Sequence, residues 1–82
     1  HLLVVCGMMT HMCVDATVRA AFDHGLECVT VRDACATKGL AFGGEEIPAG
    51  MVHGAFLAAL GATYSRIVSA SELAAQMGWP TA

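Results

Sequence analysis

The chain has 82 residues, of which 56% are hydrophobic and 13% are charged, and its formal net charge is −3. With only four Lys and Arg residues it has no basic patch, which argues against nucleic acid as a partner. No apolar run approaches the roughly 20 residues that span a bilayer, and no signal peptide is recognisable, so we expect a cytoplasmic protein without a membrane partner.

The first predicted element is an apolar strand over residues 2–6, rich in β-branched side chains. It leads into a turn over residues 7–13, where Thr10 is the predicted N-cap of the helix that follows. Cys13 then lies in the first helical turn. Unpaired N–H groups and the helix dipole favour a thiolate there, so Cys13 is the first candidate for a catalytic nucleophile.

Apolar residues at helical spacing predict a helix from Cys13 to about Gly25. His24 falls near the end of this helix, where a favourable contact with the helix dipole is sufficient to explain a histidine at this position without a catalytic role. A strand over residues 27–32 follows and ends at Asp33. Strand, helix and strand together predict a βαβ unit with a right-handed crossover.

Residues 38–46 contain three glycines and two acidic residues, which predicts an irregular exposed loop. Pro48 fits the first turn of a helix over residues 47–64. This helix is rich in alanine and is expected to pack closely on a sheet or on another subunit, so a homo-oligomer is expected. A third strand over residues 65–70 and a last helix that opens at Ser71 and stops before Pro80 complete the pattern.

Strands that alternate with helices predict a parallel, doubly wound (Rossmann-like) α/β sheet with helices on both faces. In such sheets the ligand crevice lies at the carboxyl ends of the strands. Cys13 and Asp33 both fall at such ends. The low charged fraction and the apolar strand directly after His1 indicate that this chain is one part of a larger fold.

The four cysteines are predicted to be free thiols, with Cys6, Cys28 and Cys35 packed in the core. A zinc site formed by Cys6, His11, Cys13 and Cys35 is an alternative, but these residues lack the short paired spacings of structural zinc sites, so no metal is expected.

His11 and the methionines of the turn leave alternatives open. His11 could pair with Cys13, although residues this close on a turn rarely face each other, and a role in the wall of a pocket is favoured. Met8, Met9 and Met12 either line an apolar pocket or fill the core.

Several segments resemble the C-terminal half of the isochorismatase-like cysteine hydrolases, a superfamily that includes nicotinamidases and N-carbamoylsarcosine amidohydrolase. They are residues 4–17, with the pattern Gly-x-x-Thr-x-x-Cys-Val, residues 19–21, Gly25, residues 29–34 and residues 68–73. The resemblance implies that residues 1–82 are the C-terminal half of a single hydrolase domain.

The resemblance also implies the chemistry. Cys13 would attack a small amide or related C–N bond and form an acyl-enzyme. A cis peptide bond between Met8 and Met9 would aim the Met9 N–H beside the Cys13 N–H, forming an oxyanion hole. Thr10, His11 and Met12 would contribute to the substrate pocket, and no cofactor is implied.

In this superfamily the catalytic Asp and Lys belong to the N-terminal half, which these 82 residues do not include. Lys38 lies in a glycine-rich segment and is not assigned that role, and Asp33 is expected to be a structural hydrogen-bonding residue. The base that activates Cys13 must then come from another segment or chain, and these residues alone are expected to be inactive. The alternative is a non-catalytic α/β module used for oligomer contacts or for binding a small ligand.

Overall fold

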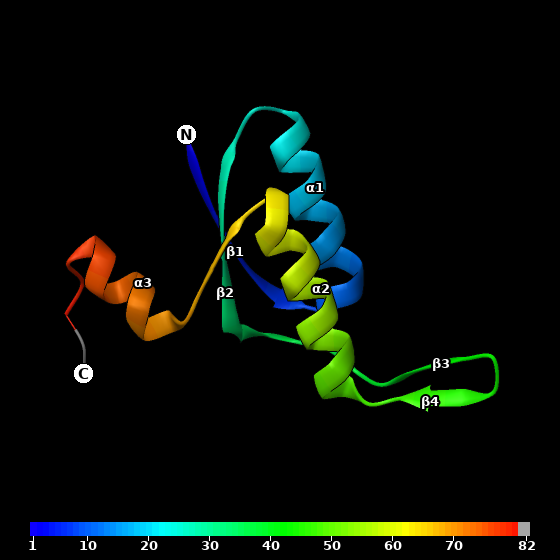
Figure 1. Cartoon of the computed structure of the whole chain (residues 1–82). Helices are drawn as coiled ribbons and strands as arrows, with labels where there is room; N and C mark the ends of the chain where they lie inside the picture. The colour runs from blue at the N-terminus through cyan, green and yellow to red at the C-terminus, as the bar shows by residue number, and fades with distance from the viewer. Residues whose placement is uncertain (81–82) are drawn as a thin grey trace.

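The computed structural model describes residues 1–80 and contains a parallel sheet with helices against both faces. The three strands follow the order β1-β2-β5: β1 (Leu2–Met8), β2 (Glu27–Ala36) and β5 (Arg66–Val68). The helices are α1 (Asp15–Asp23), α2 (Ala49–Thr63) and α3 (Ala70–Met77). Helices α1 and α2 lie together on one side of the strands and α3 lies on the other (Figure 1). The predicted fold class is therefore confirmed.

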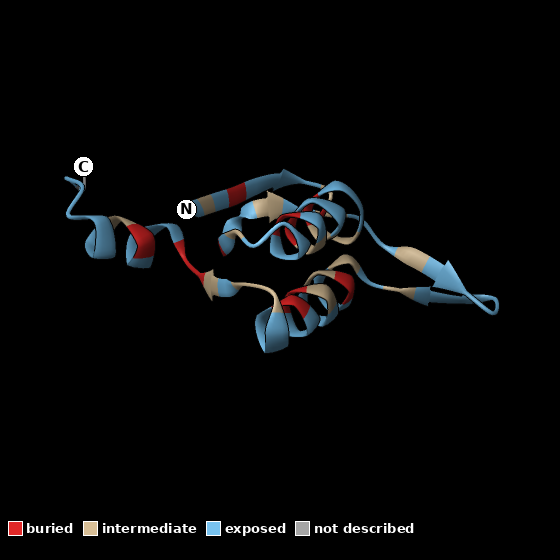
Figure 2. Cartoon of the chain, turned by 90° about the horizontal axis from the view of Figure 1, so that it is seen from above, coloured by how far each residue is buried: buried red, intermediate tan, exposed pale blue. Residues whose placement is uncertain are grey.

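Alternate residues of β2 serve the two faces of the sheet, because successive side chains of a strand point in opposite directions. Cys28 belongs to the core under α1 and α2, whereas Val29 and Val31 belong to the core under α3. The first core comprises Val5, Val14, Val18, Ala21, Cys28 and Leu60, and the second comprises Val29, Val31, Val68 and Leu73. Figure 2 shows these buried positions where the helices and strands face one another.

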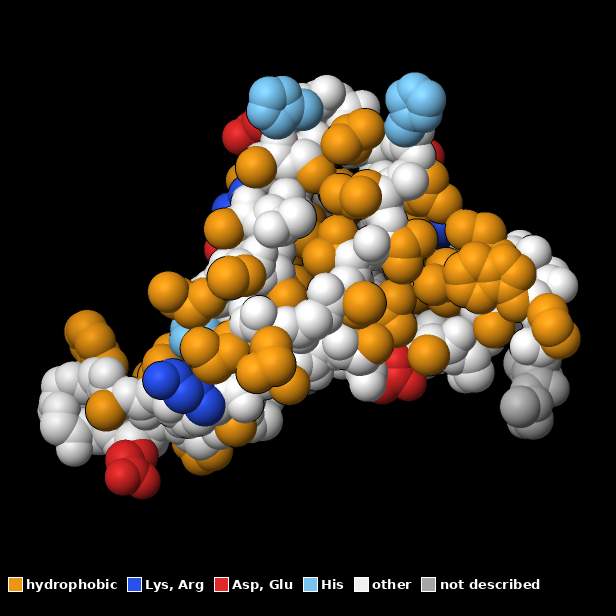
Figure 3. All heavy atoms as spheres, turned by 180° about the vertical axis from the view of Figure 1, so that it is seen from behind, with side chains coloured by type: hydrophobic (Ala, Val, Ile, Leu, Met, Phe, Trp, Pro, Cys, Tyr) orange, Lys and Arg blue, Asp and Glu red, His pale blue; other side chains and the backbone are white. Residues whose placement is uncertain are grey.

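β1 is covered less completely than β2. Leu2, Val4 and Met8 are 43%, 39% and 70% exposed. Cys6 is also exposed, so the prediction that it packs in the core is wrong. Strand alternation turns Cys6 away from Val5 and its core, toward the face on which α3 packs against β2. Apolar side chains also gather on the surface seen from behind the view of Figure 1 (Figure 3).

The segment predicted as an irregular loop is instead a β-hairpin, formed by β3 (Leu40–Phe42) and β4 (Glu45–Ile47). Gly43 and Gly44 connect the two strands and both have positive φ, at 61° and 80°. Two such residues form the tight turn whose twist matches that of the flanking strands. The hairpin projects from the body of the molecule (Figure 1), and Phe42 near its tip is 82% exposed.

The pairing of β1 with β2 is interrupted just before the end of β1. Val5 is opposite Thr30, but Gly7 is opposite Cys35, so the register shifts and residues 31–34 of β2 have only Cys6 opposite them on β1. Gly7 has a φ of 130°, which a side chain would disfavour. Beyond the irregularity Met8 pairs with Ala36, so β2 supports β1 up to its last residue.

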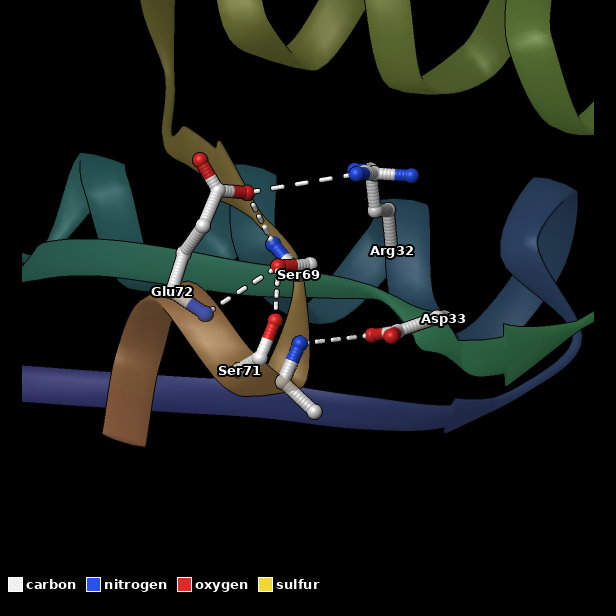
Figure 4. A network of polar contacts seen from close by, with 6 residues as sticks. Arg32, Asp33, Ser69, Ser71 and Glu72 are labelled. Atoms are coloured by element: carbon white, nitrogen blue, oxygen red, sulfur yellow. Dashed lines mark hydrogen bonds and ion pairs between the residues drawn. The ribbon is translucent and has the colours of Figure 1, made fainter. Parts of the chain in front are cut away.

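The last helix is anchored by a polar network between the C-terminal half of β2 and the segment after β5 (Figure 4). It begins at Ala70 with Ser69 as its N-cap, slightly earlier than predicted. The Ser69 Oγ accepts from the Glu72 N–H at 3.1 Å, and a Glu72 carboxylate oxygen accepts from the Ser69 N–H at 2.7 Å. Asp33 accepts a hydrogen bond from the Ala70 N–H at 2.7 Å. The predicted structural role of Asp33 is thus confirmed.

Within residues 1–80, every helix is too short or too polar to cross a membrane.

Replacing Leu60 by Ala should destabilise the intact protein by about 2–5 kcal/mol, because it opens a cavity in the core between the sheet and the helices. The Leu60 side chain is fully buried. Met51 lies on the same helix but is 66% exposed, so Met51→Ala is the matched control and should cost much less. Urea unfolding of both variants measures the difference, and equal losses would contradict the assigned core.

The Glu72 carboxylate should make stability depend on pH. Its hydrogen bonds with Ser69 hold the pKa of Glu72 below the ordinary value of 4.5. Because the pKa of Glu72 is lower in the folded state than in the unfolded state, its carboxylate adds to the free energy of unfolding at pH values above the unfolded pKa. This stabilisation is lost as the pH falls through the folded pKa. Glu72→Gln keeps a capping side chain but does not titrate. In urea unfolding, the advantage of the wild type over Glu72→Gln should therefore shrink below pH 4.5. A difference that is constant with pH would rule this out.

Candidate active site

Cys13 lies on a tight turn that connects the carboxyl end of β1 to α1. Residues Thr10–Val14 form a single π-helical turn, and α1 follows directly from Asp15. The Met9 carbonyl accepts hydrogen bonds from the N–H groups of Met12, at 3.0 Å, and Val14, at 3.2 Å. Val14 is buried in the core under α1, whereas Cys13 beside it is exposed. The turn therefore holds its backbone through Met9 and Val14 and presents the thiol to solvent.

The residues before the turn have an unusual backbone. The peptide bond between Met8 and Met9 is cis, and Met9 is the N-cap residue of the turn in an extended conformation. Met8 and Met12 are 70% and 56% exposed, so apolar side chains flank Cys13 on the chain.

Thr10 is not an N-cap, contrary to the sequence prediction. No side chain caps the turn, and Thr10 is itself the first residue of the π-helix. Its side chain is fully buried. The Thr10 hydroxyl lies 2.9 Å from the Nδ1 of His53 and 3.4 Å from the carbonyl oxygen of Ala36. Thr10 thus fastens the turn to α2 and to the end of β2, and its side chain reaches no solvent-filled pocket in the described structure.

His11 is held by β2 and α2. Its Nδ1 is 2.6 Å from the Thr37 hydroxyl oxygen, just beyond the end of β2. Its ring meets the ring of Phe56 edge to face, with 6.0 Å between the ring centres. The contacts of the His11 ring are thus with Thr37 and Phe56 and not with the Cys13 thiol, while its predicted place in a pocket wall stays a prediction.

The remaining cysteines differ from Cys13 in their surroundings. Burial raises the pKa of the Cys28 thiol, which lies in the core under α1. Burial also raises the pKa of Cys35, next to Ala36 on β2. Both effects make these thiols poorer nucleophiles. Among residues 1–80, no group of three or more His, Cys, Asp or Glu side chains is placed to hold a metal ion.

Two hollows, of about 540 and 530 Å³, are lined by residues other than those of the turn. One lies at the base of the β3–β4 hairpin and includes Lys38, and the other lies between α2 and β5 and includes Arg32. Neither hollow includes Cys13, Thr10, His11 or Met12 in its lining. Asp33 is engaged at the N-terminus of α3, and Lys38 lines the hollow at the base of the hairpin.

His53 is the residue of this site that the sequence did not assign. It stands on α2 and bonds both to Thr10 and, through Nε2 at 3.0 Å, to the carbonyl oxygen of Arg32 on β2. The only signal in the sequence was one histidine in a helix otherwise built from apolar and small residues.

Comparison with known proteins decides the family. The model of the isochorismatase domain matches residues 2–45, which include β1, the turn with Cys13, α1 and β2. The chain belongs to the isochorismatase family. It is 55% identical over 65 residues to YddQ, an uncharacterized isochorismatase family protein of Bacillus subtilis. That match covers 79% of this chain and 36% of YddQ.

Two solved structures have the same fold. One, from Oleispira antarctica and assigned to the isochorismatase hydrolases, is 53% identical with a TM-score of 0.87, covering 89% of this chain and 39% of the other. A cysteine hydrolase from Pseudomonas syringae pv. phaseolicola is 19% identical with a TM-score of 0.88, covering 94% of this chain and 37% of that one, which shows the shared fold. This isochorismatase-family chain therefore spans somewhat more than a third of each of these relatives.

The exposure of the thiols predicts an order of labelling. In the intact protein at pH 7, iodoacetamide should modify Cys13 faster than Cys28 and Cys35, because burial raises the pKa of the latter two. Cys6 is the comparison that lies in a strand instead of on the turn, on the face of β1 that these 82 residues leave exposed. Peptide mass spectrometry over time gives each rate, and equal slow labelling of all four thiols would contradict an activated Cys13.

Proposed function

We propose that this chain is the C-terminal part of a cysteine-dependent hydrolase that acts on a small amide or related C–N bond, with Cys13 as nucleophile. The observation that carries the proposal is an exposed thiol on a tight turn at the carboxyl end of β1, between two buried anchors, Thr10 and Val14. The carboxyl ends of the strands are where open α/β sheets bind their ligands. The isochorismatase family supports the reaction class.

The proposed reaction has two steps. The Cys13 sulfur attacks the carbonyl carbon of the amide, a carbon–sulfur bond forms, and the C–N bond breaks as the nitrogen leaves with a proton. Water then attacks the thioester and releases the carboxylic acid and the free thiol. Splitting the hydrolysis in this way replaces one difficult step by two easier ones.

The backbone N–H groups of Met9 and Cys13 are proposed to stabilise the oxyanion that forms in each step. Backbone donors fixed before the reaction cost no reorganisation, and losing one such donor lowers the rate about a hundredfold or more. The turn that carries them is held by the Met9 carbonyl, which accepts two hydrogen bonds, and by the buried Thr10. His11 and Met12 are proposed to form part of the wall beside the substrate, with Thr10 beneath them.

The general base is proposed to come from the part of the protein outside these 82 residues. Asp33 already accepts a hydrogen bond from the Ala70 N–H at the start of α3, and Lys38 lies at the base of the hairpin, in a hollow whose lining does not include Cys13. The exposed side chains Leu2, Val4 and Met8 on β1 support a further segment packed against this strand. We also propose that the protein is a homo-oligomer. The apolar side chains on the surface in Figure 3 support contacts with the further segment and with a second subunit.

Replacing Cys13 by Ala should abolish hydrolysis in the intact protein while the fold and assembly stay unchanged. Removing the nucleophile of a serine protease lowers kcat about a millionfold, so a loss of at least about a thousandfold is expected here. Cys6→Ala, at the other exposed thiol, is the matched control and should keep its activity. The assay measures release of ammonia or amine from a panel of small amides and carbamoyl compounds, with circular dichroism and size-exclusion chromatography as checks.

Full activity of the Cys13→Ala variant would overturn the mechanism. If the wild type hydrolyses none of the panel and Cys13 labels no faster than Cys6, the non-catalytic module is the correct description instead.

A further inference from the structure

We propose that His53 is a positioning residue for the nucleophile turn: it ties the buried hydroxyl of Thr10 to the backbone of β2 and so fixes where Cys13 stands. This inference rests on the proposed function of Cys13. It assigns a role to a side chain 40 residues further along the chain that lies on another element, α2.

The first step of the argument is the pair of contacts that His53 makes. Its Nδ1 is 2.9 Å from the Thr10 hydroxyl oxygen, and its Nε2 is 3.0 Å from the Arg32 carbonyl oxygen. Both ring nitrogens are thus engaged, one with the turn and one with β2. The imidazole therefore acts as a bridge between two segments.

The chemistry of the two partners fixes the direction of the bridge. A carbonyl oxygen only accepts, so the Nε2 of His53 carries the proton and donates it to Arg32. In the neutral ring Nδ1 is then the acceptor, and the Thr10 hydroxyl donates to it. The alternative acceptor for this hydroxyl, the Ala36 carbonyl, lies at 3.4 Å, a long distance for an O–H donor.

Burial makes the Thr10 contact costly to lose. The Thr10 side chain is completely buried, so without His53 its hydroxyl keeps only the long contact to Ala36. A buried polar group without a good partner costs more than the net value of the bond it has lost. The turn would then shift or sample other positions, and Cys13 is three residues away on the same π-helical turn.

A second contact from α2 supports the same role. Phe56 lies three residues after His53, hence on the same side of the helix, and its ring meets His11 of the turn. Next to His53, Val52 is buried, so the helix itself is fixed. The face of α2 that carries His53 and Phe56 therefore holds the turn at two successive residues, Thr10 and His11.

The test uses the intact protein and four variants. His53→Ala removes both contacts, His53→Asn keeps a group near the position of Nδ1, and Thr10→Val removes the hydroxyl while keeping the shape. His24→Ala is the matched control, because His24 lies at the exposed end of α1. The readouts are kcat and KM, the rate at which iodoacetamide labels Cys13, and amide hydrogen exchange of residues 9–14.

His53→Ala should lower kcat and the labelling rate of Cys13 about 10- to 100-fold, with a smaller change in KM, since displacing a reacting group by about 1 Å costs that much. His53→Asn should recover most of the loss, because its amide oxygen can accept from Thr10. The effects of His53→Ala and Thr10→Val should not add, because both remove the same bond. Amide exchange of the Met12 and Val14 N–H groups should become faster in His53→Ala.

The inference would be overturned if His53→Ala kept the wild-type kcat, labelling rate and amide exchange. It would also be overturned if the effects of His53→Ala and Thr10→Val added, or if His24→Ala lowered kcat as much as His53→Ala. Failure of the proposed function gives a different result: a wild-type Cys13 that labels no faster than Cys6. In that case the exchange experiment still decides whether His53 holds the turn.

Discussion

The site depends on how one short turn is fastened to the sheet behind it. A thiol on a flexible loop would sample many positions, whereas Cys13 sits between Thr10 and Val14, both of which are buried. Val14 is held by apolar packing under α1, and Thr10 by hydrogen bonds to His53 and to the end of β2. Apolar contacts alone leave a turn free to slide, but hydrogen bonds to buried groups fix its direction.

The fold provides these anchors by extending β2 beyond its regular pairing with β1. After the irregularity at Gly7, the strands pair again through Cys35 and Ala36. This second pairing places Ala36 and Thr37 beside Thr10 and His11. The stretch of β2 at this register shift carries Arg32, whose carbonyl accepts from His53, and Asp33, which accepts from the Ala70 N–H at the start of α3. One stretch of β2 thus supports both the nucleophile turn and the last helix.

The sequence predicted the elements whose signals are local. The β-branched strands, the helix that begins at the turn, the helix near Pro48 and the role of Asp33 all follow from short-range patterns, and the structure contains them. Two bounds were wrong: β2 continues past Asp33 to Ala36, and Pro48 is the N-cap residue of α2 instead of lying in its first turn. The hairpin was missed because its glycines were taken as a sign of irregularity, although two adjacent glycines between short strands are a turn signal. Cys6 was misjudged because strand composition alone does not say which neighbouring strand or helix covers a face.

The anchors of the site could not be predicted, because they join residues far apart in the chain. Thr is a residue type that often caps helices, but Thr10 does not cap this turn. Only the position of α2 in the fold shows that its hydroxyl is hydrogen-bonded to His53 instead. The partner of His11, Thr37, likewise comes from beyond β2. The resemblance to cysteine hydrolases pointed to Cys13, but the contacts that hold it are tertiary.

The most direct measurement of the central claim is detection of the acyl-enzyme. The intact protein is mixed with an amide that it hydrolyses, in the presence and absence of hydroxylamine, quenched with acid during the first turnovers, and digested for mass spectrometry. Acyl transfer through Cys13 predicts the acyl mass of the substrate on the peptide that contains Cys13, and a hydroxamate among the products when hydroxylamine is present. Continued turnover with neither an adduct on Cys13 nor a hydroxamate would contradict the mechanism.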